Sequence, residues 1–169
     1  MLIGQGLHMA GVELKNLEYA VLLHDAGQIV LPEEVLTKPT KLTGQEYDII
    51  KEHPLRGVQI VKHIGALKSV LPYILYHHEN YDGSGYPKGL KKNHIPLGAR
   101  IMAVVGAFEA MIIKKPYRVA RTIDDAIEEI RRNAGTQFDP KVVELFLNAV
   151  DRRDIRAMLE KEAYESSHS

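Results

Sequence analysis

The segment LGARIMAVVGAFEAMII, from Leu97 to Ile113, decides the fold class of this chain of 169 residues. The segment is apolar and continuous over more residues than a strand normally has, so it predicts a buried helix at the centre of the molecule. Apolar residues recur at helical spacing on both sides of it, and the sequence has no pair of alternating segments that would predict paired strands. The sequence therefore predicts an all-α protein.

Several other segments have helical patterns with recognisable ends. Thr43 and Glu46 have the spacing of a capping box, which predicts that a helix begins there. Pro54 should end or kink that helix, because proline has no N–H to donate and clashes with the preceding turn. Besides the central segment, helices are predicted at 15–26, 43–53, 55–64, 70–79, 122–133 and 140–151, with a single turn at 33–36 and a long ordered loop at 82–96.

This pattern divides the chain into a main domain with a segment on each side. Residues 1–14 form an N-terminal segment, residues 15–158 form the domain, and residues 159–169 are expected to be a frayed tail. A single domain fits the length of the chain, which is sufficient to bury a hydrophobic core.

Composition excludes several classes of function. Lysine plus arginine and aspartate plus glutamate number 22 each, so no net positive field attracts a nucleic acid polymer. The chain has no cysteine, which excludes disulfides, thiolate metal sites and cysteine nucleophiles. No leader pattern and no membrane span is recognisable in the sequence. We therefore expect a soluble domain with a cytoplasmic location.

Histidine and aspartate residues near the ends of helical segments indicate a metal site. His24 and Asp25 end one predicted helix, His53 ends the next, and His77 and His78 lie near the end of a third. Imidazole and carboxylate groups are good ligands for first-row transition metals. The Asp25 carboxylate is the catalytic candidate, because it could bridge two cations in a two-metal hydrolytic site. The competing interpretation is that each histidine is an ordinary core residue, as single buried histidines usually are.

The paired histidines are followed by the loop Asp82-Gly83-Ser84-Gly85-Tyr86-Pro87. One interpretation is a tight turn, in which glycine allows positive φ and proline stops the chain from continuing as a helix. The other is a loop that brings backbone amides and Tyr86 close to a ligand beside the metals. The position of the loop directly after the histidines favours the second interpretation.

The order and content of these motifs resemble the HD-GYP family, bacterial domains of the HD superfamily that hydrolyse cyclic di-GMP. The resemblance runs from about Leu17 to Val150. The motifs that carry it are Leu22-Leu23-His24-Asp25-Ala26-Gly27, Lys51-Glu52-His53-Pro54, the signature from His77 to Pro87, Ile95-Pro96-Leu97 with Ala99-Arg100-Ile101, Lys115-Pro116-Tyr117-Arg118 and Gly135-Thr136-Gln137-Phe138-Asp139-Pro140.

This resemblance implies an antiparallel helical bundle of the HD-superfamily type with a bi- or trinuclear metal centre at its middle. The metal would be iron or manganese, with zinc, nickel or magnesium as alternatives. The family's metal ligands correspond to His24, Asp25, His53, His77 and His78. The family's contacts to the substrate correspond to Tyr86, Lys115, Arg118 and the position of Gln28. For Lys115 and Arg118 the other interpretation is an exposed pair of loop charges.

Three departures from the family pattern concern catalysis. Gln28 replaces a lysine that is a candidate proton donor or phosphate contact, and glutamine has no charge and no transferable proton near neutral pH. Gly106 replaces a metal-binding aspartate, and Glu109 replaces a second aspartate that follows it. The residues that precede His24 are also too few for a family helix that carries another ligand histidine. The resemblance therefore implies fewer metal ions than in the family, and weak or absent hydrolysis.

Three functions remain open on the sequence alone. The first is an HD-GYP phosphodiesterase-type domain that binds metal but has impaired activity on cyclic di-GMP or a related cyclic dinucleotide. The second is a non-catalytic module that senses such a ligand or docks onto a partner, for example a diguanylate cyclase domain of the GGDEF type. The third is an active phosphohydrolase on a different nucleotide, with the missing ligand supplied by Glu109, by water or by a second chain. An uncovered apolar side of residues 15–26 also predicts a homodimer.

Overall fold

The computed structural model describes the backbone of residues 1–113 and 120–168, and the side chains of these residues as far as Lys161. Helices dominate the described part, in which the β-type contact is an isolated bridge between Ala134 and Phe138, so the all-α prediction is confirmed. The α-helices are α1 (Leu2–Gly6), α2 (Gly11–Leu23), α3 (Glu33–Leu36), α4 (Gly44–Ile50), α5 (His53–Val61), α6 (Leu71–Tyr76), α7 (Leu97–Ile112), α8 (Ile123–Arg132), α9 (Pro140–Val150) and α10 (Arg153–His168). Three 3-10 segments join them, namely η1 (Ala26–Val30), η2 (Gly65–Val70) and η3 (Lys92–His94).

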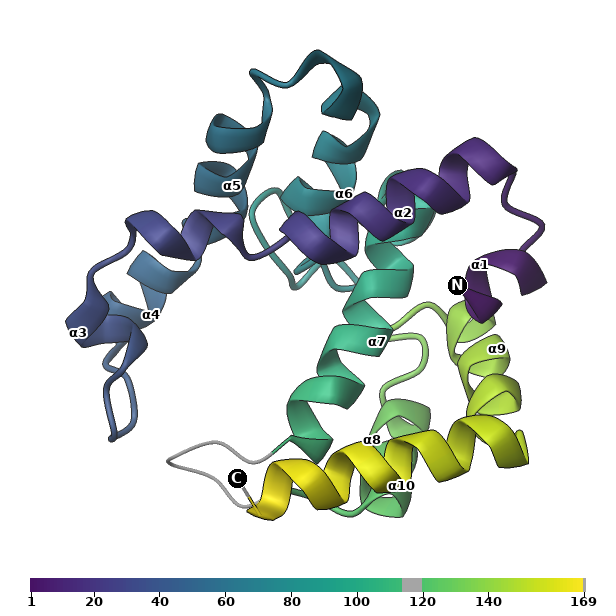
Figure 1. The fold of residues 1–169 in the computed structure, drawn as a ribbon. Coiled ribbons are helices and arrows are strands. Elements are labelled where there is room, and N and C mark those ends of the chain that lie inside the picture. The colour runs from purple at the N-terminus through teal and green to yellow at the C-terminus, as the bar shows by residue number, and fades with distance from the viewer. Residues whose placement is uncertain (114–119, 169) are drawn as a thin grey trace.

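Helix α7 is at the centre of the fold, as the sequence predicts (Figure 1). It contacts α6, α8 and α9, and also α1 and α2. Val104 and Phe108 lie on its buried side, and the Phe108 ring meets Phe146 of α9 edge to face at 5.0 Å between centroids. Each large apolar side chain buried in this way contributes roughly 1.5–3 kcal/mol. The other side of α7 is open to solvent at Val105 and Gly106.

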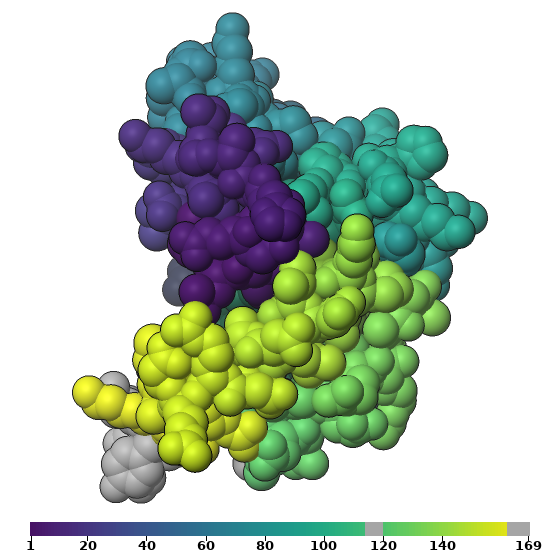
Figure 2. Space-filling model, turned by 90° about the vertical axis from the view of Figure 1, so that its right-hand side faces the viewer, coloured from purple at the N-terminus to yellow at the C-terminus, as the bar shows by residue number. Residues whose placement is uncertain are grey.

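The remaining helices form two groups around α7. In Figure 1, α8, α9 and α10 lie around its lower end, whereas α2, α5 and α6 lie around its upper end. Figure 2 shows the N-terminal residues (purple) against the C-terminal helices (yellow and light green), where α1 contacts α9. Within the described residues, no helix has both the length and the apolar character needed to cross a membrane.

The starts of α4 and α5 follow from their capping chemistry. The capping box is confirmed, because the Glu46 N–H donates to the Thr43 hydroxyl and the Thr43 N–H donates to the Glu46 carboxylate. Pro54 lies in the first turn of α5, where its missing N–H costs nothing. His53 therefore begins α5 instead of ending the helix before it, which corrects the predicted position of this residue.

Other boundaries differ from the predicted ones at short or terminal segments. Helix α2 begins at Gly11, four residues earlier than expected, because the Glu13 carboxylate accepts the Ala10 N–H and caps the helix. The five-residue α1 was not predicted. Helix α10 extends from Arg153 to His168 and so includes most of the segment expected to be a tail.

A close backbone approach joins η1 to α5. A Cβ atom added to Gly27 would overlap the His53 carbonyl oxygen and would lie 2.5 Å from the Gly57 nitrogen. Because backbone atoms cannot move aside as a flexible side chain can, only glycine fits at position 27. This approach places the chain that follows His24 and Asp25 directly against the first turn of α5.

Two glycine-to-alanine substitutions test this packing. Gly27→Ala should lower the free energy of unfolding by about 3 kcal/mol, the upper range for overpacking, since the new methyl group meets backbone. Gly106→Ala is the matched control, because the space around position 106 is open and alanine is the better residue within a helix. It should raise the free energy of unfolding by about 0.5–1 kcal/mol. Urea denaturation measures both, and equal effects would contradict the close approach at Gly27.

Candidate metal centre

The structure brings together the five residues that the sequence suggests as metal ligands. His24 and Asp25 follow α2, His53 begins α5, and His77 and His78 follow α6. The ring centroids of His77 lie 5.2 Å from His24, 5.2 Å from His53 and 4.1 Å from His78. The rings of His53 and His78 are 4.9 Å apart. Side chains from three helix ends therefore share one cluster, which argues against four unrelated core histidines.

Three of these rings are oriented by the backbone in the same way. The Nδ1 atom lies 2.8 Å from the Val21 carbonyl oxygen in His24 and 2.8 Å from the Ile50 oxygen in His53. In His77 it lies 2.7 Å from the Ile74 oxygen. In each case the carbonyl belongs to the third residue before the histidine. A carbonyl can only accept, so Nδ1 carries the proton and Nε2 has the lone pair in a neutral ring.

The Nε2 atoms converge on a small space. His53 Nε2 and His77 Nε2 are 3.2 Å apart, and ligand atoms of His53, His77 and His78 all lie within 4.8 Å of one another. Two lone pairs facing each other at this distance repel unless a proton or a cation lies between them. The donor set therefore fits a divalent first-row metal ion, for which imidazole and carboxylate are suitable ligands.

The Asp25 carboxylate links the two sides of the cluster. Its Oδ2 lies 3.3 Å from His24 Nε2, and its Oδ1 lies 3.4 Å from His53 Nε2. The side chain of Asp25 is 49% exposed, whereas that of His53 is 2% exposed. Asp25 therefore stands at the mouth of the cluster, with His53 behind it.

The environment keeps the buried rings neutral and Asp25 ionised. Burial lowers the pKa of His53, lowers that of His77 to about 3 and lowers that of His78 to about 4. Burial alone would raise the pKa of Asp25, but the hydrogen bond from His24 and the positive charge that this ring carries when protonated bring it down to about 2. At neutral pH His53, His77 and His78 thus present unprotonated nitrogens beside one carboxylate, the state that metal binding requires. His24 differs, because its hydrogen bond to Asp25 raises its pKa.

Tyr86 forms one wall of the cluster. Its ring stacks on that of His78, with 4.9 Å between centroids and 22° between planes. Burial raises the pKa of the Tyr86 phenol, and the charges of Tyr47 and Asp25 act in the same direction. The loop after the histidines therefore does more than turn the chain, because it places an aromatic ring beside the cluster.

The other candidate positions differ in how they relate to the cluster. Gln28 is half-buried on η1, and Gly106 lies on the exposed side of α7 with open space around it. Glu109, one turn after Gly106, is exposed, and its charge adds to the effect of Asp25 in raising the pKa of His24. Lys115 and Arg118 lie outside the described residues.

Two buried carboxylates were not singled out from the sequence. Glu79 and Asp139 are 2% and 5% exposed, although acidic side chains are seldom buried. Asp139 pairs with Arg100 at the start of α7 and accepts the Lys141 N–H at the start of α9. Glu79 follows His78 directly within the quoted signature, but nothing local in the sequence shows that its side chain is buried.

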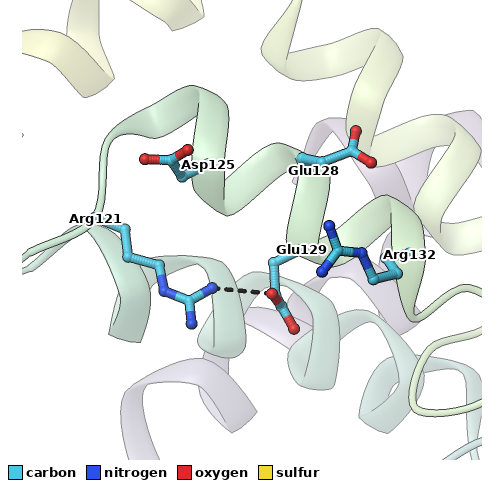
Figure 3. A pocket seen from close by; sticks show the side chains of 5 residues that line it. All are labelled: Arg121, Asp125, Glu128, Glu129 and Arg132. Atoms are coloured by element: carbon cyan, nitrogen blue, oxygen red, sulfur yellow. Dashed lines mark hydrogen bonds and ion pairs between the residues drawn. The ribbon is translucent and has the colours of Figure 1, made fainter.

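A hollow elsewhere on the surface has no part in this centre. It is lined by Arg121, Asp125, Glu128, Glu129 and Arg132 (Figure 3). Arg121 donates to the Glu129 carboxylate at 3.0 Å, so these two charges on its wall pair with each other. The hollow contains none of the clustered histidines.

Comparisons with known proteins identify the family of the chain. Residues 2–142 match the HD domain family. A cyclic di-GMP phosphodiesterase of Thermotoga maritima is 37% identical over 147 residues, which cover 86% of this chain and 40% of that protein. The cyclic di-GMP phosphodiesterase response regulator RpfG of Xanthomonas campestris is 39% identical over 167 residues, covering 95% of this chain and 41% of that protein. The chain thus spans about two fifths of the length of these curated relatives.

Two solved structures share the fold. A cyclic GMP-AMP-specific phosphodiesterase of Vibrio cholerae superposes with a TM-score of 0.74 at 23% identity, over 98% of this chain and 45% of that one. An HDG"Y"P protein from Bdellovibrio bacteriovorus gives a TM-score of 0.71 at 19% identity, over 89% of this chain and 48% of that one. Together with the helical fold and the histidine cluster, these matches show that the chain belongs to the HD domain family and, within it, to the HD-GYP branch.

Proposed function

We propose that this chain is an HD-GYP-type, metal-dependent phosphohydrolase domain that binds cyclic di-GMP or a related cyclic dinucleotide and hydrolyses it slowly or not at all. The observation that carries the proposal is the convergence of imidazole nitrogens and the Asp25 carboxylate beside Tyr86. Relatives named for cyclic di-GMP and for 3'3'-cGAMP support a cyclic dinucleotide as the ligand without choosing between them.

In this proposal the metal is held by His24, Asp25, His53, His77 and His78. When bound, a divalent cation supplies Lewis-acid polarisation of a phosphodiester oxygen and activation of a water molecule. The neutral rings of His53 and His77 offer their Nε2 lone pairs without first losing a proton, and the ionised Asp25 supplies the negative charge that attracts the cation. Iron or manganese is the proposed metal, by the resemblance to the family.

The remaining contacts with the ligand would come from groups around the mouth of the cluster. The Tyr86 ring covers His78 on one side, so it excludes water there and offers an aromatic surface against which a base can pack. Gln28 can donate and accept hydrogen bonds but carries no charge. Lys115 and Arg118 are proposed as the cations that meet the phosphates, on the resemblance to the family alone.

The expectation of reduced catalysis rests on two positions. Gly106 has no side chain with which to ligate a metal, and Gln28 cannot supply a proton as lysine can. Removing one group that stabilises a transition state can cost about 10²–10³ in rate. These losses also support the second candidate, a cytoplasmic module that senses the dinucleotide or docks onto a GGDEF-type partner without catalysis.

Metal analysis tests the ligand set. Elemental analysis of the manganese-loaded chain should find one ion or fewer per chain. His77→Gln should weaken metal binding about 10–100-fold or more, because it removes a buried ligand. His63→Gln changes an exposed histidine and serves as the control, with no loss of metal expected. Two or more ions per chain would contradict the reduced centre, and equal loss in both variants would contradict the ligand set.

Titration and hydrolysis of cyclic di-GMP separate the two functions. The metal-loaded chain should bind the dinucleotide, as measured by calorimetry, and should cleave it at least about 100-fold more slowly than the Thermotoga maritima relative. Detectable slow cleavage favours the impaired enzyme, and binding with no cleavage favours the sensor. Cleavage at the rate of the relative would refute impaired catalysis, and failure to bind would refute a cyclic di-GMP site.

Exposed apolar residues near the cluster support self-association. Leu22 and Ile29 are 79% and 82% exposed, on α2 and η1 respectively, and we propose that a second copy of the chain covers them. Light scattering should report a dimer for the natural sequence and a monomer for Leu22→Lys combined with Ile29→Lys. Ile64→Lys, at a residue that is 53% exposed after α5, should remain dimeric. A monomer for the unsubstituted chain would contradict the proposal.

A further inference from the structure

Glu79 is a buried carboxylate that joins two parts of the loop after the histidines. Its Oε1 accepts the backbone N–H of Lys88 at 2.7 Å, and its Oε2 accepts that of Leu90 at 3.0 Å. Gly89 between them has a φ of +66°, a conformation that lets N–H groups on either side of it face one anion. Both oxygens of Glu79 therefore hold the part of the loop that follows Tyr86.

Backbone contacts at Gly85 and Tyr86 also hold this loop. The Tyr86 N–H donates to the His78 carbonyl oxygen at 3.1 Å. Gly85 lies so close to the backbone of Asn80 and Glu79 that a Cβ atom there would overlap both. Tyr86 thus lies between a close backbone approach on one side and the two hydrogen bonds to Glu79 on the other.

We propose that Glu79 is a positioning residue that sets the place of the Tyr86 ring over the His78 ring. The stacked rings are 4.9 Å apart, so a shift of the loop by a fraction of that distance would change the surface beside the cluster. Glu79 itself does not reach a ligand, and it acts through the backbone of residues 86–90. The consequence for ligand binding rests on the proposed function, whereas the placement of the ring does not.

A carboxylate that merely stabilised the fold would behave differently. Its loss would lower the free energy of unfolding but leave the ring in place in every folded molecule. Asp139 is a suitable control of this kind, because it is also buried and also accepts a backbone N–H, that of Lys141 at 2.8 Å. It lies at the start of α9 and pairs with Arg100.

NMR of the metal-free chain, labelled with carbon-13 at histidine Cε1, tests the placement of the ring. Glu79→Gln keeps the size of the side chain but replaces one accepting oxygen with an NH₂ group, so one of the two loop N–H groups loses its acceptor. The His78 Hε1 resonance, assigned with His78→Gln, should then move to where it lies in Tyr86→Leu, because both variants lose the ring current of the stacked tyrosine. Asp139→Asn should leave it in place. An unmoved resonance in folded Glu79→Gln, or an equal movement in Asp139→Asn, would overturn the proposal.

Hydrogen exchange of the unsubstituted chain decides the question if Glu79→Gln does not fold. The amides of Lys88 and Leu90 should exchange at least about tenfold more slowly than unprotected amides, because both donate to a buried acceptor. Exchange of both amides at the unprotected rate would show that Glu79 does not hold the loop, and would end the proposal.

Binding of cyclic di-GMP to the metal-loaded chain tests the functional consequence. Glu79→Gln should weaken binding as much as Tyr86→Leu does, and the double variant should bind no more weakly than either single variant. Additive losses would overturn the role of Glu79 in placing Tyr86 for the ligand. If the unsubstituted chain fails to bind the dinucleotide, the proposed function is refuted, and the NMR comparison still decides the placement of the ring.

Discussion

The Nδ1 atoms of His24, His53 and His77 are each tied to a carbonyl oxygen three residues earlier, and the geometry of the centre depends on this constraint. The hydrogen bond fixes the plane of each ring and leaves Nε2 as the accepting atom. Because the carbonyl belongs to the turn just before the histidine, the end of a helix determines where each Nε2 points. Separate helix ends must therefore be brought together before the nitrogens can converge.

Backbone contacts achieve this convergence at glycine positions. Gly27 lets η1 approach the first turn of α5, and Gly57 lies against Ile74 of α6. Gly85 lets the loop return to the end of α6, where Tyr86 stacks on His78. The apolar core around α7 stabilises the whole arrangement, but these close approaches set the distances within it. The cluster is thus a product of backbone packing as much as of its own side chains.

Features of the structure were predictable from the sequence where the residues that determine them lie close together along the chain. The central helix was predictable because its apolar run is long, and the start of α4 because Thr43 and Glu46 form a local cap. The five candidate ligands were predictable as one cluster because the motifs that contain them resemble those of the family. Helix α1 was not predictable, because five residues carry too little periodicity. The burial of Glu79 depends on amides nine and eleven residues away, and no local pattern reports such a contact.

Two of the departures from the family pattern concern single residues of the candidate site and not the helical frame. Gly106 has no side chain and Gln28 carries an uncharged amide, whereas the histidine cluster, the Tyr86 stack and the helical frame are all present. The two departures therefore concern individual positions and leave the fold of the family intact.

The proposed ligands come from three segments that all precede α7, and none of them comes from α8, α9 or α10 as far as these are described. A cation shared by residues on either side of His53 therefore acts as a cross-link that closes a long loop within the first half of the chain. Its release would free that half to open locally, while the packed C-terminal helices stay folded around α7. If the proposed ligands hold a cation, metal occupancy would change the order of one half of the molecule and leave the other half unchanged.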